Sequence, residues 1–198
     1  MTRARPYDRD VALNAAMQLF WRKGYHATSL KDLEAALKMK PGSIYAAFQS
    51  KEALYLASLE RYYHSTCESL QTKIAEAGSP LAGLAEFLRG FGMARENPND
   101  YNVCMVVKSM IDATAEDAKI GEIAREYLDL MSDEFAAIFQ QAQDLGELDS
   151  DADISYLARR YQMNLTALRF EAQRGGTDAT LAKLAEEMAH DVEKLRVA

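Results

Sequence analysis

TSLKDLEAALKMKPGSIYAAFQSKE, residues 28–52, predicts two short helices joined by a tight turn. Ser29 followed by Asp32 is typical of a capping box at a helix start. The leucines of the segment then recur at helical spacing and mark one buried face of about two turns: Leu30, Leu33 and Leu37. The first of the two helices is therefore amphipathic and packs one side against a core.

A second short helix is expected to begin at Pro41. Proline suits the first helical turn because its missing N–H would have no partner there. Ile44 and Phe48 lie four residues apart and share a face. Upstream, residues 7–23 carry apolar residues at helical spacing, and Gly24 stands where a left-handed C-terminal residue would end that helix. The three helices together predict a small helix-turn-helix head.

Charge is distributed unevenly along the chain. Residues 1–51 contain nine Lys and Arg against four Asp and Glu, a net charge of +5. Residues 52–198 carry 14 against 26, a net of −12, and the two parts together give the −7 of the whole chain. An acidic protein repels polyanions, so we expect any contact with nucleic acid to be confined to the basic N-terminal segment.

The rest of the chain is rich in good helix formers and poor in β-branched alternation, which predicts an all-α fold of about nine helices. We expect a DNA-binding domain at residues 1–50, which holds the basic segment, and a larger helical domain at 51–198. A long helix starts after Ser50 and runs from Lys51 to about Ala77. Further helices are predicted at 80–96, 101–114, 117–145, 151–174 and 178–196.

The second helix of a helix-turn-helix places its N-terminal residues in the major groove. Polar and small side chains gather at that end, where a glycine lets backbone approach closely and Ser, Tyr and Lys can bind bases or phosphates. The candidate DNA-binding residues are Thr28, Ser29, Lys40, Pro41, Gly42, Ser43, Tyr45 and Lys51. Structural roles stay open for three of them: Tyr45 could cover the core, Lys51 could be a solvated charge, and Thr28 could be a helix cap only.

Residues 7–60 resemble the DNA-binding head of the TetR/AcrR family of transcriptional regulators. The resemblance rests on F-x-x-x-G-Y at Phe20, Gly24 and Tyr25, on T-S-L-K-D-L, and on S-I-Y-A-A-F-x-S-K-E-A-L leading into a long helix. It implies a dimeric regulator, with repression the family's usual sense, that binds a palindromic operator and is released by a small effector. Two positions depart from the family pattern: Lys38 replaces a frequent glycine and Ala47 a frequent histidine.

In the body, two consecutive helices carry apolar residues at spacings of three and four. These stripes could pair with a second copy or fill one subunit's core; the resemblance favours the dimer. The candidate interface residues are Ile154, Leu157, Tyr161, Leu165, Leu168, Leu181, Leu184 and Met188. Aromatic, Met and Cys side chains further upstream could line an apolar effector site or be plain core. They are Tyr63, Cys67, Phe87, Phe91, Cys104, Met105, Tyr127 and Met131.

Two alternative functions fit parts of the sequence. Cys104 lies in a segment similar to one found in part of the family, and a nearby Lys108 ammonium would favour its thiolate, so a thiol-based sensor is one alternative. A helical interaction module without DNA binding is another.

No metal-ligand spacing, phosphate loop or nucleophile–base pattern is present, so we expect no cofactor, no metal and no enzyme activity. The N-terminus lacks a signal-peptide core, which predicts a cytoplasmic protein without membrane contact.

Overall fold

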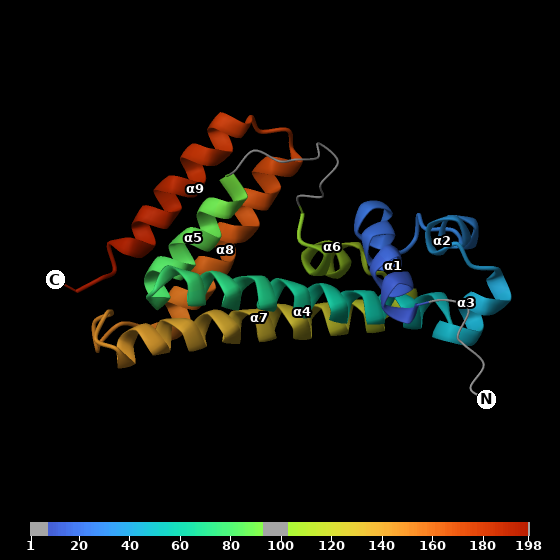
Figure 1. The fold of residues 1–198 in the computed structure, drawn as a ribbon, viewed down its shortest axis with the longest axis horizontal. Helices are drawn as coiled ribbons and strands as arrows, with labels where there is room; N and C mark the ends of the chain where they lie inside the picture. The colour runs from blue at the N-terminus through green and yellow to red at the C-terminus, as the bar shows by residue number, and fades with distance from the viewer. Residues whose placement is uncertain (1–7, 93–102, 198) are drawn as a thin grey trace. The chain divides into compact units, whose positions relative to one another are not determined.

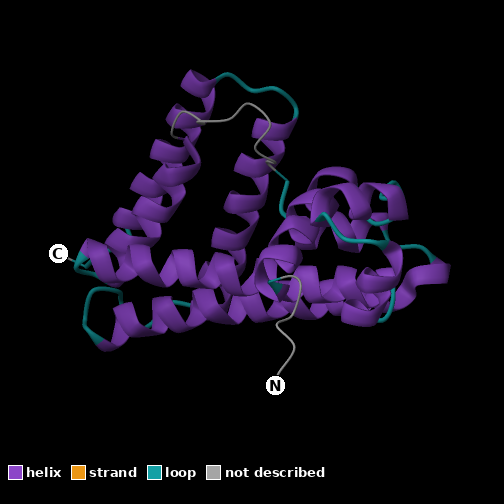
Figure 2. Cartoon of the chain, turned by 45° about the vertical axis from the view of Figure 1, so that its right-hand side comes forward, coloured by secondary structure: helices purple, strands orange, loops and turns teal. Residues whose placement is uncertain are grey.

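The computed structural model describes residues 8–92 and 103–197, and within them the chain is all-α (Figures 1 and 2). These residues form nine α-helices and one short 3-10 helix, with an isolated bridge between Leu148 and Arg196 in place of any strand. The helices are α1 Arg9–Lys23, α2 Leu30–Leu37, α3 Pro41–Phe48, α4 Lys51–Ala77, α5 Pro80–Gly92, α6 Met105–Asp112, η1 Ala115–Asp117, α7 Ala118–Asp144, α8 Ile154–Gln173 and α9 Asp178–Glu193. The predicted fold class is confirmed. The predicted helices at 80–96 and 101–114 both reach into residues 93–102, which lie outside the described residues.

The described residues fall into two compact units. The first contains residues 8–64 and 105–127, and the second contains residues 65–92, 103–104 and 128–197. Helices α4 and α7 contribute to both. The predicted domain boundary at residue 50 stays a prediction, but α6 and the start of α7 group with the N-terminal helices. None of the helices in the described ranges is both long enough and apolar enough to span a bilayer.

The first unit is built around the apolar faces of α1, α2 and α3. Leu33 and Leu37 of α2 and Ile44 and Phe48 of α3 are buried, as their spacing predicted. Phe20 of α1 is fully buried, and its ring makes an edge contact with the Tyr55 ring at 4.8 Å. Burial of each of these large side chains stabilises the unit by about 1.5–3 kcal/mol.

Gly24 ends α1, but not in the conformation that its position predicted. Its φ of 79° and ψ of 174° lie outside the left-handed helical region, in a region that only glycine enters readily. The N–H of Gly24 donates to the carbonyl oxygen of Phe20 at 2.7 Å, so the last turn of α1 still closes. The extended ψ then sends the chain away from the helix axis toward α2.

In the second unit, α5 packs closely against α9. A Cβ on Gly92 would lie 2.8 Å from the Cα of Ala182, so the two helices approach at a small-residue contact. Tyr161 of α8 is buried, and its hydroxyl donates to the carbonyl oxygen of Leu84 at 2.7 Å. Arg89 of α5 donates to carboxylates of α9 at 2.8 Å. These contacts bind α5, α8 and α9 into one core.

Candidate nucleic-acid interface

The start of α2 is fixed by a reciprocal capping box. The N–H of Asp32 donates to Oγ of Ser29 at 3.2 Å, and the N–H of Ser29 donates to Oδ2 of Asp32 at 2.8 Å. Lys23 at the end of α1 adds an ion pair to Asp32 at 2.8 Å. The hydrogen bond from Lys23, followed by those from Ser29, holds the pKa of Asp32 well below its ordinary value. The predicted capping box is confirmed, and the Lys23 contact ties α1 to α2.

The pH dependence of stability should therefore show the contribution of Asp32. Its pKa is depressed in the folded state, so its contribution is complete above the ordinary carboxyl pKa of 3.8 and declines as the pH falls toward the folded-state value. We expect Asp32→Asn to lower the unfolding temperature at neutral pH. The difference from wild type should shrink as the pH is lowered below about 4. Thermal unfolding followed by circular dichroism at several pH values measures this, and a difference that stays constant with pH would contradict the ion-pair explanation.

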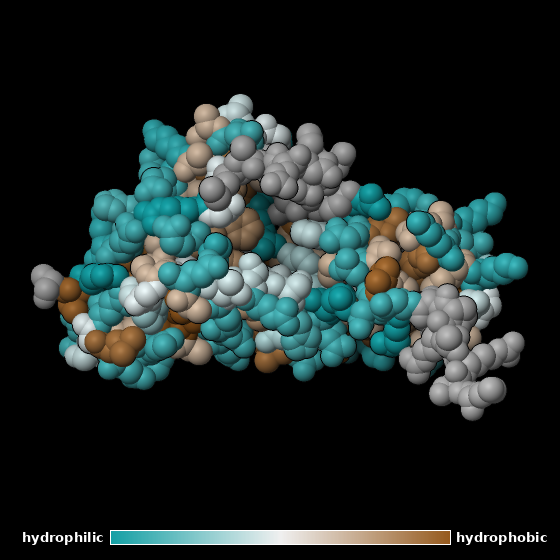
Figure 3. All heavy atoms as spheres, viewed as in Figure 1, coloured by the Kyte–Doolittle hydropathy of each residue, from teal (hydrophilic) through white to brown (hydrophobic). Residues whose placement is uncertain are grey.

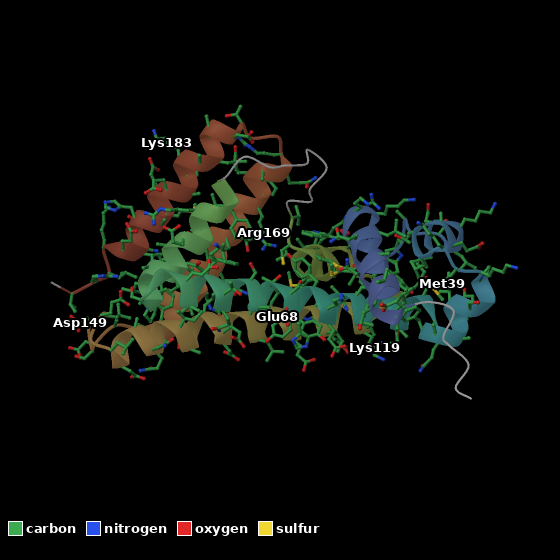
Figure 4. The ribbon with its side chains drawn as sticks, in the orientation of Figure 1. Met39, Glu68, Lys119, Asp149, Arg169 and Lys183 are labelled. Atoms are coloured by element: carbon green, nitrogen blue, oxygen red, sulfur yellow. The ribbon has the colours of Figure 1, made fainter. Side chains whose placement is uncertain are left out.

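The turn between α2 and α3 contains one buried side chain and one residue with an unfavourable backbone conformation. Met39 lies in this turn (Figure 4) and is buried. Lys38 caps α2 with φ of 53° and ψ of 38°, the left-handed helical region. A non-glycine residue there costs roughly 1–2 kcal/mol, which explains why glycine is common at this place in the family pattern. Lys40 then takes an extended conformation and is the N-cap of α3.

The outward face of α3 consists of small and polar residues. Gly42, Ser43, Tyr45 and Ala46 are all exposed, and Tyr45 keeps 46% of its surface accessible. A Cβ added to Gly42 would meet nothing within 4 Å, so the fold itself does not require glycine there. Glycine in a helix costs about 1 kcal/mol relative to alanine. A bare backbone at this exposed place leaves room for close approach of an external surface.

Most of the other DNA-binding candidates also make contacts within the fold. Ser29 is exposed, Pro41 is half-buried at the first position of α3, and Thr28 is fully buried. The hydroxyl of Thr28 donates to the carbonyl oxygen of Gly24 at 2.7 Å, so this side chain supports the turn before α2. The Lys51 ammonium lies 4.5 Å from the centre of the Tyr25 ring, and partial burial lowers the pKa of Lys51. Hydrophilic side chains cover much of the surface over α2 (Figure 3).

A set of contacts between α6, η1 and the head was not predicted from the sequence. The Lys108 ammonium donates to the carbonyl oxygens of Trp21 and Arg22 at 3.4 and 3.2 Å, at the C-terminal end of α1. The hydroxyls of Tyr55 and Ser109 share a buried hydrogen bond of 2.6 Å. The partners are separated by 54 to 87 residues along the chain, so no local pattern could reveal them.

A third contact joins η1 to the turn after α1. His26 lies 3.2 Å from the carboxylate of Asp117, which is buried. Hydrogen bonds from Thr114, together with His26, hold the pKa of Asp117 below its ordinary value. Helix α6 and η1 therefore contact the C-terminal end of α1 and the turn that leads from it to α2.

The effector candidates are divided between the two units. In the first unit, the rings of Tyr63 and Tyr127 stack at 5.1 Å, and Met105 is buried. In the second unit, Phe87 and Phe91 make an edge contact at 5.3 Å, and Arg169 lies 4.7 Å from the Phe91 ring. Cys104 and Met131 are buried there, and Cys67 is half-buried. Each unit thus contains one aromatic pair among the candidates, and an effector site stays a prediction.

The dimer candidates on α8 and α9 prove to be largely internal. Leu157, Tyr161, Leu165, Leu168 and Leu181 are buried within the single chain, and Ile154, Leu184 and Met188 are half-buried. Five of the eight candidates therefore fill the protomer's own core, and a role of the other three in a dimer interface stays a prediction. Different apolar residues of α8 reach solvent. They are Tyr156, Met163 and Phe170, spaced seven apart.

Comparison with known proteins identifies the head. Residues 12–58 match the model of the bacterial regulatory proteins, tetR family. The HTH-type transcriptional repressor ComR of Escherichia coli (strain K12) is 27% identical over 93% of this chain and 89% of its own length. The uncharacterised HTH-type transcriptional regulator YezE of Bacillus subtilis (strain 168) is 26% identical over 87% of this chain and 90% of its own.

Solved structures extend the likeness to nearly the whole fold. A cysteine mutant of the TetR family transcriptional regulator CifR, complexed with 26-bp double-strand operator DNA, covers 95% of this chain and 98% of its own with a TM-score of 0.82 and 29% identity. A TetR family regulator from Cytophaga hutchinsonii shares the fold with a TM-score of 0.84, at 18% identity over 96% and 95% of the two chains. The family comprises transcriptional regulators rather than enzymes. Residues 12–58 thus match the head of the tetR family, and over nearly its whole length the chain is similar in sequence and fold to TetR family transcriptional regulators.

Proposed function

We propose that this regulator binds operator DNA as a dimer, with α3 of each copy in the major groove, and that it represses transcription. The exposed face of α3 carries the proposal, because its side chains and its bare Gly42 are not used by the protein's own core. Two relatives support it: ComR is named a repressor, and the CifR mutant was solved with operator DNA. A footprinting experiment tests it. We expect a two-fold symmetric site with half-sites about one helical turn apart, whereas protection of a single half-site or of none contradicts it.

The exposed stripe of α8 supports dimerisation. Tyr156, Met163 and Phe170 recur every seven residues and so lie along one side of the helix. Acidic side chains of α9 already pair within the protomer, with Arg89 of α5 and Arg160 of α8. The apolar stripe is therefore what supports the contact, and a second copy packed against this side of α8 would cover it.

Met163→Glu should therefore separate the dimer. A carboxylate placed in an apolar interface without a partner costs about 3–5 kcal/mol, which raises the dissociation constant of the dimer by at least roughly a hundredfold. Leu145→Glu is the matched control, because Leu145 at the C-terminal end of α7 is as exposed as Met163, at 67%, and does not belong to α8. Analytical ultracentrifugation should show monomers for Met163→Glu only. Equal behaviour of both variants would remove the α8 stripe from the interface.

We further propose that a small effector releases the DNA by changing the position of α6. The three contacts of α6 and η1 with the end of α1 and with α4 support this route. A movement of α6 must either break these contacts or move the contacted parts of α1 and α4 with it. The effector needs only to favour one of two conformations; a coupling of about 1–3 kcal/mol changes DNA affinity about 5- to 150-fold.

Reciprocal binding tests the effector proposal. A compound that raises the unfolding temperature of the protein should lower its affinity for DNA, and DNA should lower the affinity for the compound by the same factor. Cys104 gives the alternative of a thiol sensor, in which oxidation replaces the compound. The Lys108 ammonium donates to α1 carbonyls, so it is engaged with the head. Release by peroxide that is abolished in Cys104→Ser would favour the thiol over a ligand.

A further inference from the structure

The exposed part of α3 offers few groups that can distinguish one base pair from another. Guanine is read by Arg or Lys, adenine by Asn or Gln, and thymine by contact with its methyl group. Exposed residues within α3 are Gly42, Ser43, Tyr45 and Ala46, none of which belongs to the first two classes. Gln49 follows at the C-terminal end, which a recognition helix turns away from the base edges. The N-terminal end of α3 is the end that enters the groove. Its N-cap, Lys40, is of a residue type that can recognise guanine.

Two neighbouring cations, Lys23 and Lys51, are engaged within the described part of the fold, whereas Lys40 is not. Lys23 is paired with Asp32 at 2.8 Å, and Lys51 lies over the Tyr25 ring. The Lys40 side chain is exposed and does not cap its helix. Across residues 8–92 and 103–197 it takes part in no hydrogen bond or ion pair with another described residue. Its ammonium can therefore reach an external acceptor without breaking a contact that the fold needs.

We propose that Lys40 reads a guanine in each operator half-site. Its ammonium donates to O6 and N7 of that guanine in the major groove, while Gly42 lets the backbone of α3 come close enough for the reach. Lys40 is then a specificity-determining residue rather than one more phosphate contact. The inference rests on the proposed function, because it names the base that the same interface recognises.

The first arm of the test finds the base. The wild-type protein selects its preferred duplex from a random-sequence pool, and each guanine of the selected half-site is then replaced by 7-deazaguanine, which lacks the N7 acceptor. One such replacement per half-site should weaken wild-type binding by about tenfold or more. A selected half-site without guanine, or one in which no replacement matters, overturns the inference and leaves the proposed function intact. Failure to select any sequence overturns the proposed function, and the inference with it.

The second arm connects the base to the residue. Lys40→Ala should bind the selected duplex more weakly and should lose no further affinity on the 7-deaza replacement, because the two changes remove one contact. Its own selection should relax at that position alone. Lys183→Ala removes the same charge from α9 (Figure 4) and should retain the wild-type preference. If Lys40→Ala keeps the wild-type sequence preference and only lowers the salt dependence, Lys40 binds phosphate and the inference is wrong.

Discussion

Gly83→Ala is expected to destabilise the second unit strongly. A Cβ at this position of α5 would lie 2.5 Å from the Cα of Ile74 and 3.1 Å from its backbone nitrogen. Backbone atoms cannot rotate away as a side chain can, so α4 and α5 must separate. Overpacking of this kind costs about 3 kcal/mol, which corresponds to a decrease of roughly 6–12 °C in unfolding temperature for a chain of this size. Differential scanning calorimetry measures it.

Gly90 gives a matched control in the same helix. A Cβ there meets nothing within 4 Å, so Gly90→Ala adds a methyl group without a clash. Because alanine is the better helix former, this variant should gain about 0.5–1 kcal/mol. Opposite signs for the two substitutions are therefore predicted. If Gly83→Ala is as stable as Gly90→Ala, the close approach of α4 and α5 is wrong.

Tyr45→Ala is expected to abolish most operator binding while the fold stays intact. Tyr45 is 46% exposed on α3, and alanine is a better helix former, so stability should change by less than about 0.5 kcal/mol. The phenol is the largest side chain on the outward face of α3. Its loss removes contacts from both heads of a dimer, so affinity should fall by roughly tenfold to a hundredfold.

Ile111→Ala serves as the control for Tyr45→Ala. Ile111 is an exposed apolar residue of the same unit, but it lies on α6 and outside the helix-turn-helix. Fluorescence anisotropy with a labelled duplex should show weak binding for Tyr45→Ala and wild-type binding for Ile111→Ala. If both variants bind as wild type does, α3 does not carry the DNA contact.

Local patterns in the sequence predicted local structure well. The capping box at Ser29, the proline start of α3 at Pro41 and the length of α4 all depend on neighbours within a few residues, and the structure confirms each of them. The exposure of Gly42 and Tyr45 also follows from the helical periodicity of Ile44 and Phe48. Their role in DNA contact stays a prediction.

Contacts between segments that are far apart in the chain could not be predicted from sequence patterns. Periodicity shows which face of a helix is apolar, but it does not say whether the same chain or a second copy covers that face. Leu165 and Leu168 are covered by their own chain, whereas Met163 between them in α8 is exposed. Lys108 follows Cys104 by four residues in the sequence, yet its ammonium donates to the carbonyl oxygen of Arg22, 86 residues away. Such pairings depend on tertiary packing.

The central claim is that the basic head of this acidic protein binds DNA. The salt dependence of binding tests this claim most directly. Affinity of the wild-type protein for its selected duplex should be measured between 50 and 200 mM salt. Each phosphate neutralised by Lys or Arg releases counterions, so the affinity should fall at least about a hundredfold over this range. An affinity that does not change with salt, or no retention of duplex at 50 mM, would contradict the account.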